Sequence, residues 1–328
     1  MTDPTPIAGV EPAPAEPVVP AEPVTTPALA VDHVSRWYGN VVAINDVSFS
    51  LSGGVTGLLG PNGAGKSTLL HMLSGFLRPS TGSVAVEGTP TFGNPEVYRR
   101  IGLVPERESA YTFLTGREFV TASARLHQLA DPEAAATRAI GHVEMAATED
   151  RRIGTYSKGM RQRIKVASAL VHDPPILLLD EPFNGMDPRQ RLHMMELLRR
   201  MAAEGRTILF SSHILEEVGR LAEQVLVIVA GRLAASGDFR EIRRLMTDRP
   251  HTFTVRSSDD RALAAVLVTQ PSIAGVSLDD GMLTVRSTDF GAFSRSVTGL
   301  ARRAGVSLHE LLPTDESLES VFSYLVRR

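Results

Sequence analysis

The 328-residue sequence contains no cysteine, only one tryptophan and five tyrosines, and no long apolar run. Without thiols it can form no disulfide, thiolate zinc site, iron–sulfur cluster or cysteine nucleophile, and this absence suits a reducing compartment. Its longest apolar stretches, Ile176–Leu179 and Val225–Ala230, are far shorter than the ~20 residues that a membrane-spanning helix needs. We therefore expect any association with a membrane to be peripheral.

No sign of charge dominates, because 34 Lys and Arg face 37 Asp and Glu and leave a formal net charge of −3. This balance gives no global attraction to a phosphate backbone or an anionic bilayer, so we expect no nucleic-acid partner. At roughly 100–200 residues per domain, the length allows two or three domains with sizeable cores.

Residues 1–28 differ in composition from the rest of the chain. They hold eight of the 21 prolines, and their only charged side chains are Asp3, Glu11, Glu16 and Glu22. Such a segment buries too little apolar surface to fold, and it lacks the basic start and apolar core of a secretory signal. We expect an acidic, disordered tail or tether.

Over about residues 29–245, apolar strand patterns alternate with helical ones. Short strands are expected at Leu29–Val34, Val41–Ile44 and Val47–Leu51, buried strands at Val55–Leu59, Pro175–Leu179, Thr207–Phe210 and Val225–Val229, and helices at Ser67–Gly75 and Arg189–Ala203. This alternation predicts an α/β fold with a parallel sheet covered on both faces. Residues 105–172 are mostly helical in pattern, with a capping-box spacing at Thr115 and Glu118.

Residues 250–328 have a different pattern and predict a small α+β accessory domain. Strands are expected at Thr252–Val255, Val276–Leu278, Leu283–Val285 and Val306–Leu311, helices at Asp259–Val268 and Phe290–Arg303, and a turn at Asp280-Gly281. The order βαββαβ is that of ferredoxin-like modules. A final helix carries Leu318, Val321, Phe322 and Leu325 on one face, which we expect to make core contacts.

A phosphate-binding loop is predicted between the strand at Val55–Leu59 and the helix that follows it. The segment Gly60-Pro61-Asn62-Gly63-Ala64-Gly65-Lys66-Ser67 fits the pattern G-x-x-x-x-G-K-[ST]. Its glycines let backbone N–H groups turn toward phosphate oxygens, and the helix N-terminus adds a positive dipole end. Lys66 would reach the β- and γ-phosphates, and the Ser67 hydroxyl would ligate Mg²⁺.

Two acidic residues follow the buried strand Ile176–Leu179. The carboxyl ends of parallel strands form the crevice in which open α/β sheets bind ligands. There Asp180 would hold the Mg²⁺ shell and Glu181 would be the general base that activates the attacking water. Pro182 ends the strand, because it cannot donate to the ladder.

Several further motifs resemble those of ABC-type ATPases over residues 28–245. Tyr156-Ser157-Lys158-Gly159-Met160-Arg161-Gln162-Arg163 is similar to the family signature, Asn184-Gly185-Met186-Asp187 to its D-loop, and Ser211-Ser212-His213 to its switch histidine. Tyr38 stands at the adenine-stacking position and Glu106 at the glutamine of the Q-loop. Residues 250–328 resemble the C-terminal extension of ATPases that serve ABC-2-type membrane partners.

The resemblance implies a P-loop ATPase core and assigns a role to each matching residue. ATP would be bound by Tyr38, the loop Gly60–Ser67, Thr68, Ser157, Gly159 and Asp187; Lys66, Glu181 and His213 would be catalytic; and Ser67, Glu106 and Asp180 would hold Mg²⁺. A sheet-face role for Tyr38 and a structural role for His213 are the alternatives. The signature departs from the family at Lys158 and Met160, and Glu106 adds a negative charge, so metal dependence is expected to differ from that of glutamine-bearing relatives.

The resemblance also implies partners. Each chain has one loop and one signature, so a homodimer, or a heterodimer with a related ATPase, would hold two ATP molecules between the chains. ABC-2-type permease subunits would place the chain on the cytoplasmic face of the membrane for export. They would dock near Tyr111, Phe113, Leu114 and Phe119 if these side chains are exposed, whereas inward-facing side chains there would be ordinary core. A non-transport ABC protein and a ligand-sensing or dimerising C-terminal domain are the rival interpretations, and deletion of residues 250–328 would test the latter.

Overall fold

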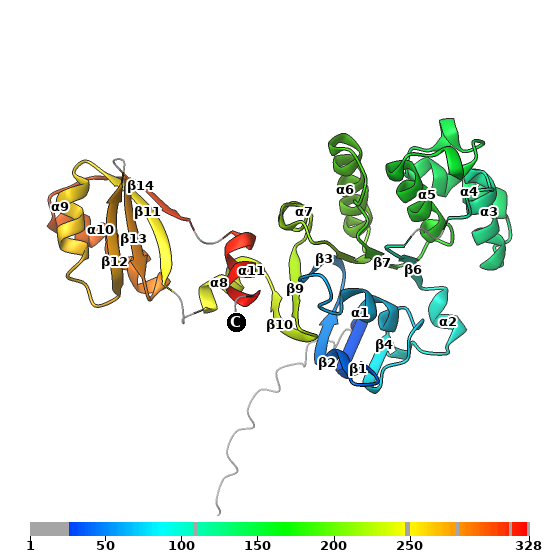
Figure 1. Cartoon of the computed structure of the whole chain (residues 1–328). Coiled ribbons are helices and arrows are strands. Elements are labelled where there is room, and N and C mark those ends of the chain that lie inside the picture. Colours follow the sequence, from blue (N-terminus) through cyan, green and yellow to red (C-terminus); the bar gives the residue numbers. More distant parts are fainter. Residues whose placement is uncertain (1–25, 108–109, 247–249, 280–281, 315–316, 327–328) are drawn as a thin grey trace, which may run out of the picture.

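The computed structural model describes residues 26–107, 110–246, 250–279, 282–314 and 317–326, which fold into a first unit and a smaller C-terminal unit (Figure 1). Nearly all of the predicted tail at residues 1–28, and the predicted turn Asp280-Gly281, lie outside the described residues.

A six-stranded sheet organises the first unit. Its order is β10-β9-β3-β8-β7-β6, and all neighbours are parallel except β10, which pairs antiparallel with β9. The strands are β3 (Gly54–Leu59), β6 (Ile101–Val104), β7 (Ile176–Asp180), β8 (Thr207–Ser211), β9 (Gln224–Val229) and β10 (Arg232–Gly237). The predicted parallel sheet is confirmed.

Both faces of this sheet are buried, because alternate residues of its strands enter two different cores. On β7, Leu177 and Leu179 pack with α6 (Pro188–Ala203) and α7 (Leu215–Leu221), whereas Ile176 and Leu178 pack on the opposite side with α1 (Lys66–Leu73). The uninterrupted run Ile176–Leu179 follows from this two-sided burial.

The second face is also covered by an antiparallel sheet that the sequence patterns did not predict. Its order is β2-β1-β4-β5, formed by β1 (Leu29–Tyr38), β2 (Val41–Leu51), β4 (Thr81–Val86) and β5 (Thr89–Pro90). The three short strands expected here merge into β1 and β2, whose pairing continues through several register shifts. Irregular registers of this kind interrupt the alternation on which strand prediction depends.

A helical layer lies beside β6 and β7 (Figure 1). It contains α3 (Gly116–Leu126), α4 (Pro132–His142), η1 (Ala146–Thr148), η2 (Ile153–Thr155) and α5 (Lys158–Leu170), and the short α2 (Pro95–Tyr98) precedes β6. The predicted capping box is confirmed, because the Thr115 hydroxyl accepts from the Glu118 N–H and the Glu118 carboxylate accepts from the Thr115 N–H.

The C-terminal unit is an antiparallel sheet with two helices. Its elements are β11 (His251–Ser257), α9 (Asp260–Leu267), β12 (Ile273–Asp279), β13 (Met282–Ser287), α10 (Phe290–Arg303) and β14 (Leu308–Pro313), and the sheet order is β12-β13-β11-β14. Phe253, Leu283 and Phe293 belong to a core that is separate from the two cores of the first unit.

The last helix leaves the C-terminal unit and packs on the first one. Leu318, Val321 and Leu325 of α11 (Leu318–Val326) belong to the core that also holds Val218 of α7. Figure 1 shows α11 beside α8 (Phe239–Leu245). There the guanidinium of the fully buried Arg243 lies 5.0 Å from the centre of the Tyr324 ring. The helix expected within the accessory domain therefore contributes to the core of the first unit.

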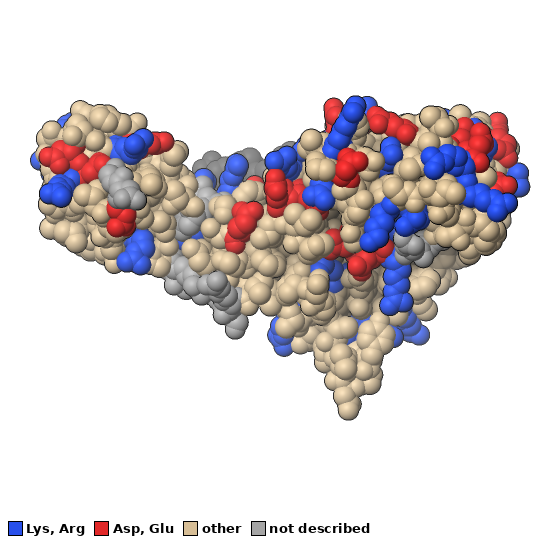
Figure 2. Space-filling view, turned by 45° about the horizontal axis from the view of Figure 1, so that its top comes forward, with Lys and Arg blue, Asp and Glu red and all other residues tan. Residues whose placement is uncertain are grey.

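None of the helices in the described parts of the chain combines the length and apolar character needed to cross a bilayer. On the face drawn in Figure 2, basic and acidic residues are interspersed over both units.

Candidate functional site

The loop between β3 and α1 closes around its own lysine. The buried Lys66 ammonium donates to the carbonyl oxygens of Gly60 at 2.8 Å and Pro61 at 3.3 Å. Gly60 must lack a side chain, because a Cβ there would lie 2.4 Å from the Ile228 carbonyl oxygen. Gly65 has a φ of 106°, and a Cβ on it would lie 2.4 Å from the Ala43 carbonyl oxygen.

The loop leads directly into the N-terminus of α1. Ser67 and Thr68 occupy the first turn of this helix, and Gly63, with a φ of 78°, has open space around its Cα. Unpaired N–H groups and the positive end of the helix dipole converge at such a junction. The loop can therefore bind a phosphate group, as its sequence predicts.

Asp180 lies at the carboxyl end of β7, level with Ser211 of the neighbouring β8. The Ser211 hydroxyl donates to Asp180 Oδ1 at 2.5 Å and accepts from the Glu181 N–H at 2.9 Å. It thus fixes the buried Asp180 carboxylate and the backbone of the next residue. Our predictions missed Ser211, although it stands two residues before His213 in a motif that they include.

Glu181 and His213 are in direct contact, with Glu181 Oε2 2.9 Å from His213 Nδ1. Glu181 has a φ of +51°, in the left-handed region that a residue with a side chain rarely adopts. Holding it there costs on the order of 1–3 kcal/mol. This backbone conformation accompanies the placement of the Glu181 carboxylate beside His213.

The electrostatics of Glu181 reflect its surroundings. Burial raises the pKa of Glu181 above its ordinary value of 4.5, while the hydrogen bond and charge of His213, followed by the charge of Lys66, act in the opposite direction. The carboxylate is therefore a stronger base than an exposed glutamate, and its pKa depends on whether His213 is present.

The signature segment forms the N-terminus of α5. The Ser157 hydroxyl caps this helix by accepting from the Met160 N–H at 3.2 Å. Gly159 lies against α6, where a Cβ would meet Gln190 Oε1 at 2.2 Å. Lys158, the departure from the family pattern, packs its aliphatic stem on Gly185: a Cβ on Gly185 would lie 2.7 Å from that of Lys158. The substitution thus fills the space over the D-loop glycine.

Other predicted residues lie outside the carboxylate–histidine cluster. Tyr38 is half-exposed at the end of β1, with the Arg36 guanidinium 4.6 Å from the centre of its ring. Asp187 caps α6 by accepting from the Gln190 N–H at 2.8 Å. Glu106 follows β6, and its backbone carbonyl accepts from Lys165. Within the described part of the chain, none of these three side chains hydrogen-bonds to Asp180, Glu181 or His213.

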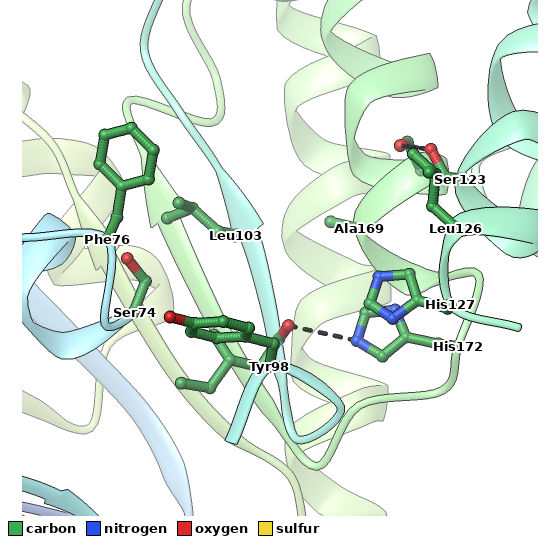
Figure 3. Close-up of a pocket in the computed structure, with 11 residues that line it drawn as sticks. Ser74, Phe76, Tyr98, Leu103, Ser123, Leu126, His127, Ala169 and His172 are labelled. Atoms are coloured by element: carbon green, nitrogen blue, oxygen red, sulfur yellow. Dashed lines mark hydrogen bonds between the residues drawn. The ribbon is translucent and has the colours of Figure 1, made fainter. Parts of the chain in front are cut away.

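A second feature is an open pocket of about 440 Å³ between the large sheet and the helical layer (Figure 3). Phe76 and Tyr98 line it on the sheet side, and Leu126, His127 and His172 line it on the helical side. The two imidazole rings stack with centroids 3.7 Å apart. Burial lowers the pKa of His172 to about 4, and its Nε2 donates to the Ile101 carbonyl at 3.2 Å.

Known proteins resemble this chain across both units. A family profile described as ABC transporter matches residues 44–184. The daunorubicin resistance ATP-binding protein DrrA3 of Streptomyces coeruleorubidus is 31% identical over 302 residues, which are 91% of this chain and 95% of that protein. The chain belongs to the ABC transporter family of ATP-binding proteins.

Two further relatives of this ABC protein match a little under two thirds of its length. The Nod factor export ATP-binding protein I of Rhizobium meliloti strain 1021 is 38% identical over 223 residues, 66% of this chain and 67% of that protein. An uncharacterised ABC transporter ATP-binding protein of Nostoc is 38% identical over 209 residues. The match to the Nostoc protein spans 62% of its length and 62% of this chain.

Solved structures share the fold of the first unit. The ATP-binding subunit of an ABC transporter, 30% identical, superposes with a TM-score of 0.61 over 66% of this chain and 92% of its own. A dimeric bacterial ABC transporter cassette, 23% identical, gives a TM-score of 0.60 over 64% of this chain and 98% of its own. The first unit is thus an ABC-type P-loop ATPase fold, and the protein is an ATP-binding, ATP-hydrolysing ABC subunit.

Proposed function

We propose that this ABC ATPase works as a dimer that couples ATP hydrolysis to export through separate ABC-2-type permease subunits. The observation that carries the hydrolytic part is the contact between the strained Glu181 and His213 beside the phosphate-binding loop. Glu181 is the general base for the attacking water, Lys66 neutralises charge on the β- and γ-phosphates, and His213 contacts the γ-phosphate. Catalysis then consists mainly of positioning and charge stabilisation.

The donors beside the loop suit Mg²⁺. This ion keeps several waters and takes one or two protein oxygens together with substrate phosphates. Asp180, buried and held by the Ser211 hydroxyl, and Ser67 in the first turn of α1 supply oxygens of that kind, and Glu106 is a third candidate. When bound, Mg²⁺ would neutralise charge on the β- and γ-phosphates.

The placement of two motifs in different parts of one chain supports the dimer. Ser157 caps a helix of the helical layer, whereas Lys66 lies in the loop after β3, and their described hydrogen bonds are local. In a head-to-tail dimer, the helix N-terminus behind Ser157 of one chain would face the γ-phosphate held by the loop of the other. The solved dimeric cassette of the same fold supports such an assembly.

The pH dependence of ATP hydrolysis should reflect the raised pKa of Glu181. Glu181 must be ionised to accept a proton, and burial raises its pKa. We therefore expect the acid limb of the kcat profile to lie at higher pH than an unperturbed glutamate would give. His213→Ala removes interactions that lower this pKa, so the limb should move to still higher pH. Profiles of kcat at saturating ATP measure the shift.

The matched control for this experiment is His193→Ala. His193 pairs with Glu144 at 3.3 Å, away from Glu181, so its removal should leave the limb in place. An acid limb at the same pH in the parent and His213→Ala proteins would show that the histidine does not tune the base.

The pocket between the sheet and the helical layer supports the coupling part of the proposal. Its rim carries two large apolar side chains in water, Phe76 at 77% and Leu126 at 84% exposure. Of the aromatics predicted to face the permease, Tyr111 and Phe113 are exposed, whereas Phe119 packs partly against the core. A short amphipathic helix from a permease loop is the occupant that would cover such an apolar rim.

Co-purification tests the coupling directly. The tagged full-length chain, expressed in its own host and retrieved from solubilised membranes, should bring down a polypeptide with several membrane spans. Phe76→Glu and Leu126→Glu should abolish this capture and leave ATP binding unchanged, because both side chains lie away from the loop. Val268→Glu, which changes another exposed apolar residue, on the C-terminal unit, is the control. Undiminished capture by both pocket variants would place the permease elsewhere.

Two finer assignments complete the proposal. Export is supported by relatives named for Nod factor export and daunorubicin resistance, and it would place the chain on the cytoplasmic face of the membrane. A ferredoxin-like C-terminal unit is supported by its sheet order, β12-β13-β11-β14, in which the two βαβ segments interleave. The cargo would be selected by the permease and not by this chain.

A further inference from the structure

Lys165 is a buried cation on α5, and the proposed function assigns no role to it. Its side chain is only 5% exposed. The ammonium donates to the carbonyl oxygens of Pro105 at 2.6 Å, Arg107 at 3.1 Å and Glu106 at 3.4 Å. Three successive carbonyls thus turn toward one charge, in the segment that leaves β6 and carries Glu106.

This arrangement fixes the backbone of residues 105–107. A buried ammonium is costly unless hydrogen bonds replace its hydration, and Lys165 is buried whereas Glu106 and Arg107 are exposed residues. The segment can therefore leave Lys165 only by depriving the buried ammonium of these three acceptors. Because α5 begins at the signature serine, Lys165 also joins this segment to the helix that carries Ser157.

The connection continues to the proposed general base. The same ammonium donates to Gln162 Oε1 at 3.2 Å, and Gln162 Nε2 donates to the Glu181 carbonyl at 3.4 Å. Both side chains are buried and lie three residues apart on one face of α5. Glu181 has a strained backbone, so a donor at its carbonyl helps to hold the conformation that aims the carboxylate.

We propose that Lys165 is a positioning residue for ATP hydrolysis. It holds the Pro105–Arg107 backbone on one side and, through Gln162, the Glu181 backbone on the other, so that Glu106 and Glu181 face the γ-phosphate in a fixed relation. The inference rests on the proposed roles of Glu181 and Glu106. It extends the site to two buried residues, neither of which needs to touch ATP.

Lys165→Met tests the proposal, because it keeps most of the side-chain volume and removes the donor. The matched control is Arg163→Met on the same helix, whose guanidinium donates to the Val143 and Glu144 carbonyls, both at 3.4 Å. We expect kcat to fall by about tenfold or more in Lys165→Met, since small displacements of catalytic groups have effects of this size. The Kd for ATP should stay within about threefold, because the loop is untouched.

Hydrogen exchange gives a readout that does not depend on turnover. Amides of β6, Glu106 and Arg107 should exchange faster in Lys165→Met than in Arg163→Met. A double-mutant cycle with Gln162→Leu should show non-additive losses of kcat, because both changes interrupt one connection. If Lys165→Met does not fold, Lys165→Leu, which also removes the donor, replaces it in the same comparisons.

The outcomes separate this inference from the proposed function. If kcat and the exchange rates of Lys165→Met equal those of the Arg163→Met control, Lys165 positions nothing. If the losses of kcat caused by Lys165→Met and Gln162→Leu are additive, Lys165 does not act on Glu181 through Gln162. Should Glu181→Gln itself hydrolyse ATP normally, the proposed base is wrong, whatever Lys165 does.

Discussion

Glu181→Gln should reduce ATP turnover by about 10²–10⁴-fold, the contribution of a well-placed general base. Glutamine has nearly the same shape but cannot accept a proton from water at neutral pH. ATP binding should remain, because the loop, Lys66 and Asp180 are unchanged. Phosphate release at saturating ATP measures turnover, and equilibrium titration with a fluorescent ATP analogue measures binding.

The control for this change is Glu216→Gln, which removes a carboxylate from the neighbouring helix α7. Glu216 is exposed and pairs with Arg220 at 2.8 Å, so its loss should alter turnover by less than about twofold. Hydrolysis by Glu181→Gln at the parental rate would exclude the general-base role. Loss of ATP binding in the same variant would instead assign Glu181 to holding the nucleotide.

Two inactive variants should restore activity to each other when mixed. Lys66→Met disables the loop of its own chain, and Ser157→Arg obstructs the pocket that its chain completes on the partner. In a mixed dimer both lesions fall in one pocket and the other pocket is intact. If chains pair at random and pockets act independently, an equimolar mixture recovers about a quarter of the parental rate.

A second mixture is the control for this complementation. Lys66 and Glu181 act on the same bound ATP from the same chain, so a dimer of Lys66→Met with Glu181→Gln has a lesion in each pocket. This mixture should stay inactive. Equal recovery in both mixtures, or recovery in neither, would contradict pockets shared between two chains.

The sequence predicts those parts of the site that depend on short segments. Lys66 and Ser67 follow from a loop whose glycines are required by close backbone contacts, such as that of Gly60 with the Ile228 carbonyl. Asp180 and Glu181 follow from the end of a strand buried on both faces. In each case residues that are neighbours in the sequence create the local geometry, so a pattern of a few residues is enough to predict it.

Features that depend on distant segments were not predictable in the same way. Ser211 meets Asp180 only because β8 lies beside β7, and Lys165 meets Pro105 across 60 positions of sequence. The sheet formed by β1, β2 and β4 depends on irregular pairing between residues as far apart in the sequence as Leu29 and Val86. A lysine at helical spacing resembles any surface lysine until the fold shows what surrounds it.

The position of α11 changes how the C-terminal unit can be studied. Leu318 and Val321 are fully buried against the first unit, and loss of two such side chains from a core costs about 3–6 kcal/mol. Deletion of residues 250–328 would therefore destabilise the ATPase itself. The resulting loss of activity could be mistaken for a loss of regulation. A better deletion removes β11 to β14 alone and joins Met246 to α11 through a flexible spacer. In that variant α11 still covers the core of the first unit.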